Sequence, residues 1–125
     1  DFSGAKVTAQ LNTFHYSVID QIPGVDKQTA MDNFPAMRVA LQSGTIDAYV
    51  SELPEAISAQ AANSDFVMVK LTDGFKTSPE DTQTAVGVRK DSSLTKEINE
   101  ALKIISSEER QQIMETAIKN QPAAE

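Results

Sequence analysis

Two short segments carry the side chains best suited to binding a small charged molecule. One spans residues 11–15 and the other spans residues 51–56, and each follows a run with strand periodicity and precedes a helical pattern. The carboxyl ends of parallel strands meet at one edge of a sheet, where α/β folds bind ligands. The first segment offers helix-terminal N–H groups and the Thr13 hydroxyl, and the second offers the Glu52 carboxylate. Together they complement the carboxylate and ammonium of a zwitterion, which predicts an amino-acid site.

Each of these side chains also has a purely structural interpretation. Thr13 is suited to the N-cap of the helix that follows it, and a cap can also donate to a bound carboxylate. Glu52 is equally well explained as a capping or solvated residue. His15 is the single histidine, and the chain contains neither cysteine nor a Gly-x-Ser-x-Gly nucleophile motif. We therefore expect His15 at a pocket rim, against the core or beside a ligand, rather than in a catalytic triad.

Composition narrows the classes of function. The chain has 125 residues, a net charge of −7 and no cysteine. This charge argues against a nucleic-acid partner, because no basic stripe is present to neutralise phosphates. The sequence contains neither a nucleotide-binding glycine motif nor a thiolate metal-binding pattern, so no cofactor and no metal are expected. No apolar run approaches the length that spans a bilayer. Because the chain starts at Asp1, we interpret it as a mature product, a cut fragment or an expressed piece.

Hydrophobic spacing predicts an α/β fold. Alternating apolar residues predict strands at 6–11, 25–29, 46–50, 66–69 and 85–88. Helical spacing and capping residues predict helices at 15–22, 33–43, 54–63, 94–105 and 107–118, whereas residues 71–82 resemble a loop. This alternation predicts a doubly wound, mostly parallel sheet with helices on both faces.

Several segments resemble, in order, motifs of amino-acid-binding proteins of ABC importers. The residues that carry the resemblance are Asp1-Phe2-Ser3-Gly4-Ala5-Lys6-Val7, Gln10-Leu11-Asn12-Thr13, Ala40-Leu41-Gln42-Ser43-Gly44-Thr45-Ile46-Asp47-Ala48, Glu52-Leu53-Pro54-Glu55-Ala56, Thr84-Ala85-Val86-Gly87-Val88-Arg89-Lys90 and the closing helices. The family has glycine where this chain has Asn12, a residue that tolerates left-handed backbone geometry. The resemblance covers nearly the whole chain and implies one lobe of a type II periplasmic-binding-protein fold.

The same resemblance implies roles and partners. Residues 1–90 would form the second, ligand-binding lobe, with 83–90 as the strand that crosses back to the first lobe. Residues 91–125 would be C-terminal helices that pack on the missing N-terminal lobe. In the isolated chain their apolar faces are expected to pack on another surface, which is the lobe itself, a swapped partner or a dimer mate. The ligand-binding residues would be Asn12, Thr13, Phe14, His15 and Glu52, with Tyr16 nearby.

The expected function is uptake of a polar amino acid rather than catalysis. Candidate ligands are glutamine, histidine, arginine and lysine, which would be delivered by hinge closure to an ABC permease. The expected location is extracytoplasmic, as a cell-surface lipoprotein or in the periplasm. Two alternatives stay open, namely a cyclohexadienyl-dehydratase-like enzyme with Glu52 as general acid and the sensor lobe of a bacterial receptor.

Overall fold

The fold was analysed in a computed structural model, which describes residues 1–120. The chain divides into two compact units, residues 1–82 and residues from 83 onward. This division falls before the segment 83–90, which was predicted to belong to the second, ligand-binding lobe of residues 1–90. No helix in the described range is both long and apolar enough to cross a membrane.

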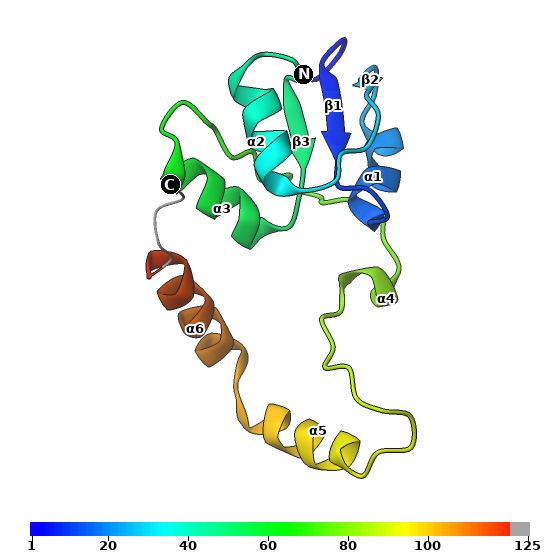
Figure 1. Cartoon of the computed structure of the whole chain (residues 1–125), viewed down its shortest axis with the longest axis vertical. Coiled ribbons are helices and arrows are strands. Elements are labelled where there is room, and N and C mark those ends of the chain that lie inside the picture. The colour runs from blue at the N-terminus through cyan, green and yellow to red at the C-terminus, as the bar shows by residue number, and fades with distance from the viewer. Residues whose placement is uncertain (121–125) are drawn as a thin grey trace. The chain divides into compact units, whose positions relative to one another are not determined.

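The first unit contains a parallel sheet of three short strands (Figure 1). The strands are β1 (Lys6–Ala9), β2 (Asp26–Lys27) and β3 (Ala48–Val50), in the order β2-β1-β3. Both pairings of the central strand β1 are parallel, with Val7 opposite Lys27 and Ala48. The chain moves from β1 to one side and then crosses to the other side, so right-handed connections place successive helices on opposite faces. The predicted doubly wound α/β class is therefore confirmed.

The helices of the first unit cover the sheet from both sides. Helix α1 (Phe14–Val18) continues into the 3₁₀ turn η1 (Ile19–Gln21), and Ile19 packs with Val7 and Ala9 in the buried core. Helix α2 (Phe34–Gln42) lies on the other face, where the rings of Phe34 and Tyr49 are 6.4 Å apart. Because both faces of β1 are covered, Val7, Thr8 and Ala9 are all buried.

Local signals in the sequence explain the bounds of α2. The side chain of Asn33 accepts a hydrogen bond from the backbone N–H of Ala36 at 2.9 Å, as expected for an N-cap. Pro35 lies in the first turn, where its missing N–H costs no intrahelical bond. Gly44 follows the helix with φ of +73°, a conformation that glycine adopts without strain.

Two predicted strands are absent from the described chain. Residues 66–69 and 83–90 form no ladder, and Val67 is 80% exposed. Alternating apolar residues favour an extended backbone, but a strand also needs a neighbour to pair with its N–H and C=O groups. These segments have no such neighbour, so the predictions of a strand at 66–69 and of a crossover strand at 83–90 were wrong.

Helices α3 (Leu53–Ala62) and α4 (Pro79–Thr82) complete the first unit. In the chain between them, the backbone of Lys76 pairs with the side-chain amide of Gln21. Gln21 donates to the Lys76 carbonyl and accepts from the Lys76 N–H, both at 2.8 Å. Helix α4 corrects the predicted loop at 71–82, because Ser78 and Asp81 cap one another there.

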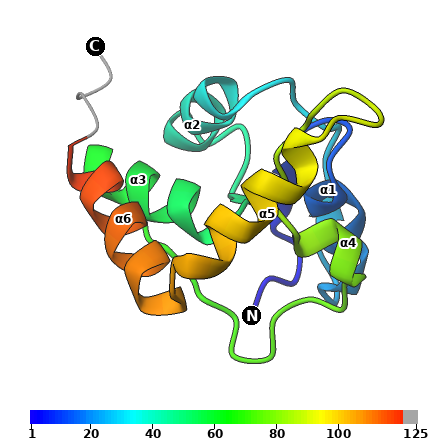
Figure 2. The same ribbon diagram turned by 90° about the horizontal axis from the view of Figure 1, so that it is seen from below.

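The second unit consists of α5 (Leu94–Ile104) and α6 (Ser107–Lys119), which are joined by a short turn (Figure 2). The predicted capping box of α6 is present: Ser106 accepts from the Glu109 N–H at 3.2 Å, and Glu109 accepts from the Ser106 N–H at 2.9 Å. Hydrogen bonding to Ser106 lowers the pKa of the Glu109 carboxyl. The backbone of Ser106 makes the largest contribution, and its side chain makes the next largest. None of residues 83–120 is buried.

Candidate functional site

The two predicted segments do meet at the carboxyl edge of the sheet. Strands β1 and β3 are parallel neighbours, so the turns that leave them lie side by side. His15, in the first turn of α1, places its Nε2 atom 3.5 Å from Oε2 of Glu52. Glu52 occupies the N-cap position of α3 but makes no capping hydrogen bond with its side chain. Of its two interpretations, side-chain capping is therefore excluded, and the carboxylate is free to face the neighbouring turn.

The turn before α1 has the backbone geometry that a close-approaching ligand requires. Asn12 has φ of +61°, in the left-handed region that glycine adopts readily and that asparagine tolerates. The backbone N–H groups of Phe14 and His15 find no hydrogen-bond partner in residues 1–120. Two donors therefore remain available at the start of α1.

Thr13 lies at the N-cap of α1, as predicted, but its hydroxyl does not cap the helix. The Thr13 Oγ1 atom donates to the Gln10 carbonyl at 2.7 Å. Its hydrogen is therefore engaged within the turn, and a bound carboxylate would meet the backbone N–H groups rather than this hydroxyl. The hydroxyl instead holds the left-handed turn at Asn12 closed.

The aromatic side chains of the segment form the wall beside these donors. The rings of Phe14 and His15 lie 4.2 Å apart, tilted by 34°. Tyr16 faces away from this contact, because its hydroxyl donates to the Gln28 carbonyl at 3.0 Å and Lys27 Nζ lies 4.3 Å from its ring centre. Phe14 and His15 thus share the edge with Glu52, and Tyr16 belongs to the packing against β2.

The environment of His15 differs on its two ring nitrogens. Nε2 faces Glu52, whereas Nδ1 is buried and has no hydrogen-bond partner among the described residues. Burial lowers the pKa of His15, and the negative charge of Glu52 opposes that shift. Burial therefore favours the neutral imidazole near pH 7, and within residues 1–120 no lysine or arginine forms an ion pair with Glu52.

A second ionic group lies next to the site and was not predicted. Arg38 donates to both carboxylate oxygens of Glu55, at 2.8–3.0 Å, and the Tyr49 hydroxyl donates to the same carboxylate at 3.2 Å. Burial and the nearby Glu55 charge raise the pKa of Tyr49. This cluster ties α2 to α3 and fixes the start of α3, where Glu52 lies. Its members are distant in sequence, so no local pattern indicates the pairing.

An apolar groove of about 610 Å³ lies within the first unit, lined by residues of β3, of α3 and of the chain that follows α3. Its lining includes Ser51 and Leu53, which flank Glu52, together with the extended residues 66–69. Asp47 lies in this groove, but its Oδ2 atom already accepts from the Lys6 N–H at 2.8 Å. The groove therefore suits apolar groups, whereas the turns beside it suit a charged ligand.

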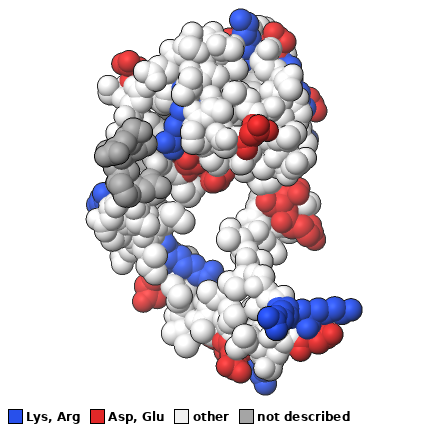
Figure 3. All heavy atoms as spheres, in the orientation of Figure 1, with Lys and Arg blue, Asp and Glu red and all other residues white. Residues whose placement is uncertain are grey.

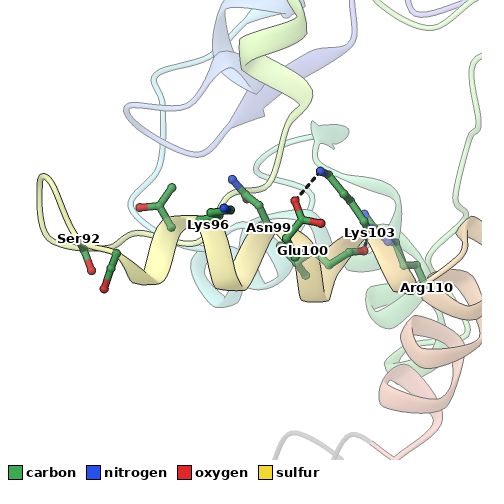
Figure 4. Close-up of a pocket in the computed structure, with 9 residues that line it drawn as sticks. Ser92, Lys96, Asn99, Glu100, Lys103 and Arg110 are labelled. Carbon is green, nitrogen blue, oxygen red and sulfur yellow. Dashed lines mark hydrogen bonds and ion pairs between the residues drawn. The ribbon is translucent and has the colours of Figure 1, made fainter.

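Another hollow, of about 640 Å³, lies along α5 in the second unit (Figure 4). In that view the side chains of Asn99 and Glu100 project from α5, and Lys103 turns toward Glu100, to which it donates at 2.8 Å. Arg110 donates to the Leu102 and Ile105 carbonyls at the end of α5. Because most of its charges are already engaged within the helix pair, this hollow assembles no comparable site.

Comparison with known proteins identifies no relative of this chain, so the interpretation of the site depends on its geometry. No family model matches the sequence, and no curated protein and no solved structure matches the chain. Within residues 1–120, no group of three or more histidine, cysteine, aspartate or glutamate side chains could hold a metal ion.

Proposed function

We propose that this chain is the amino-acid-binding lobe of a substrate-binding protein that serves an ABC importer. The observation that carries the proposal is the meeting of His15 and Glu52 at the edge where β1 and β3 end. Within residues 1–120, a carboxylate without a lysine or arginine partner and two unpartnered N–H groups lie on adjacent turns there. The order of motifs along the chain, which resembles that family, supports the same assignment.

The chemistry of the edge fits a zwitterionic ligand. The N–H groups of Phe14 and His15 would bind the α-carboxylate, with the turn at Asn12 allowing close approach. Glu52 would bind the α-ammonium through charge-assisted hydrogen bonds, which are stronger than neutral ones. Phe14 and His15 would border the ligand side chain, which we propose to be polar, as in glutamine, histidine, arginine or lysine.

The proposed mechanism needs a second lobe. A hydrogen bond to a charged group contributes about 1.5–3 kcal/mol, whereas micromolar binding requires about 8 kcal/mol. The groups on this edge therefore support binding near millimolar at best. Closure of an N-terminal lobe over the edge would supply the remaining contacts before delivery to a permease outside the cytoplasm, from the periplasm or a lipid-anchored position.

An amide-resolved NMR titration with a panel of amino acids at millimolar concentration tests the proposal. Shifts confined to residues 12–16 and 51–56 are expected, and Glu52→Gln should remove them because the ammonium loses its charged partner. Glu80→Gln is the matched control, since Glu80 is an exposed carboxylate on α4 that forms no ion pair within residues 1–120. Absence of shifts across the panel, or equal shifts in Glu52→Gln, would overturn the proposal.

The same pair of residues also supports a second candidate, an acid–base enzyme that resembles cyclohexadienyl dehydratases. A neutral imidazole 3.5 Å from a carboxylate could exchange protons with a substrate held on this edge. Turnover of prephenate by the chain, lost in both His15→Gln and Glu52→Gln, would favour this candidate over a transport role.

A further inference from the structure

The strongest feature beyond the proposed binding role is the unequal surroundings of the two nitrogens of His15. The side chain of His15 is 13% exposed, and that of Glu52 is 49% exposed. Nε2 faces the Glu52 carboxylate, and Nδ1 is enclosed without a partner. In the neutral ring the hydrogen therefore belongs on Nε2, where it can point at Glu52, while Nδ1 carries only a lone pair.

Adding a proton to this ring would change the charge that an incoming ammonium meets. The second hydrogen would lie on Nδ1, where it finds no acceptor, so burial opposes protonation. Once protonated, however, the imidazolium would lie beside Glu52 as a cation. The carboxylate would then already be neutralised, and a ligand ammonium would face a positive charge at its own binding position.

The other two ion pairs described in the first unit involve neither His15 nor Glu52. On η1 and β2, Asp20 pairs with Lys27 at 2.9 Å. On α2 and α3, Arg38 pairs with Glu55 at 2.8 Å. Glu52 is the one charged group that acts on His15 within the described range. The protonation of His15 is therefore coupled to one carboxylate, the same one proposed to bind the ligand.

We propose that His15 makes amino-acid binding pH dependent, because protonated His15 and the ligand ammonium compete for Glu52. This inference rests on the proposed function and assigns its regulation to one side chain. The competition is reciprocal, so a bound amino acid must lower the proton affinity of His15 by the same factor by which protonation weakens binding. Release of ligand on acidification follows directly.

The single histidine of the chain allows a direct test, because the Hε1 proton of its ring gives one unambiguous NMR signal. The signal is followed from pH 5 to pH 8 without ligand and with millimolar L-glutamine, L-arginine or L-lysine. We expect each amino acid that binds to shift the titration of His15 to lower pH. We also expect about fivefold weaker binding once His15 is protonated, at the lower end of typical coupling between two sites.

Two variants separate this inference from the proposed function. In His15→Gln, a neutral side-chain amide replaces the ring, so the ratio of the affinities at pH 8 and pH 5 should fall toward one, whatever the change in the affinity itself. In Glu52→Gln, the titration of His15 should move to lower pH even without ligand, because the carboxylate no longer stabilises the imidazolium; Glu80→Gln should leave it unchanged.

The outcomes are distinct. Binding with the same pH dependence in wild type and His15→Gln would overturn the inference and leave the proposed function standing. Absence of binding by all three amino acids at every pH would overturn both. The coupling would also be refuted if neither the ligand nor the substitution Glu52→Gln shifts the titration of His15.

Discussion

Apolar residues are used differently in the two units of the chain. In residues 1–82, Ile19 and Met37 are fully buried, whereas in residues 83–120 Ile104 is 82% exposed and no side chain is buried. Figure 3 shows uncharged surface between the charged groups on α5 and α6. The comparison teaches that capping and helical periodicity are sufficient to define α5 and α6, but a core forms only where a sheet provides a surface to cover.

The largest predicted difference between the units comes from truncating a buried and an exposed isoleucine. Ile19→Ala removes a side chain packed on Val7 and Ala9, and should lower the free energy of unfolding by about 2–5 kcal/mol. Ile113→Ala, on α6, should change it by less than about 0.5 kcal/mol, because Ile113 is 60% exposed. Urea denaturation followed by circular dichroism measures both values.

A large effect of Ile113→Ala would instead mean that another molecule covers α6. Sedimentation of the wild-type chain and of Ile113→Ala tests whether another molecule covers α6. Dimerisation or swapping through the apolar faces of α5 and α6 predicts a concentration-dependent dimer that Ile113→Ala weakens. A strictly monomeric wild type would contradict that expectation.

The next largest effect is expected at the ionic cluster between α2 and α3. Glu55→Gln leaves the partly buried Arg38 guanidinium without its charged partner, and should cost about 1–3 kcal/mol of unfolding free energy. It should also lower the pKa of Tyr49, since the Glu55 charge helps to raise it. The matched change Glu100→Gln, in the exposed pair with Lys103, should be nearly neutral. If chemical denaturation shows that Glu55→Gln and Glu100→Gln lower the unfolding free energy equally, the expected difference between the partly buried and the exposed pair is contradicted.

A smaller effect is expected at the helix caps. Asn33→Ala removes the cap of α2 and should cost about 1 kcal/mol, measured by urea denaturation. Ser106→Ala removes the corresponding cap of α6, which has no core to hold it in place. It should therefore reduce helix content in the circular dichroism spectrum without moving the main unfolding transition. A shifted main transition in Ser106→Ala would show that the units unfold together.

The smallest effect is a pH dependence of stability that arises from His15. Its pKa is lowered by folding, so the unfolded chain takes up the proton first as pH falls below about 6.5. Stability should therefore decline from pH 7 toward the lower pKa of the folded state, and His15→Gln should reduce that decline. Urea midpoints at several pH values measure it, and identical slopes in both proteins would exclude a contribution from His15.

How far the sequence predicts the structure depends on the range of the interactions involved. Asn33, Gly44 and Ser106 act through their own neighbours, so their roles were predicted correctly. Helix α4 had a local signal as well, the Ser78-Pro79-Glu80-Asp81 capping pattern, which was overlooked. The strands at 66–69 and 83–90 were predicted wrongly because pairing depends on a neighbour that the local pattern does not specify.

The candidate site shows the same distinction. Parallel strands share an edge, so the approach of segments 11–15 and 51–56 followed from the order of elements, and the contact between His15 and Glu52 agrees with it. Their binding of a ligand stays a prediction. The enclosure of Nδ1 and the engagement of the Thr13 hydroxyl could not be predicted, because both depend on side-chain packing rather than on spacing.

The amide pair between Gln21 and Lys76 has a consequence for cleavage by trypsin. Lys70 and Lys76 are both exposed in the extended chain before α4, and both are potential cleavage sites. The carbonyl that trypsin must attack after Lys76 already accepts a hydrogen bond from Gln21. The protease would have to break that bond before the carbonyl could enter its oxyanion hole, whereas the carbonyl of Lys70 has no such restraint among the described residues. Early trypsin fragments of the folded protein should therefore end at Lys70 rather than at Lys76.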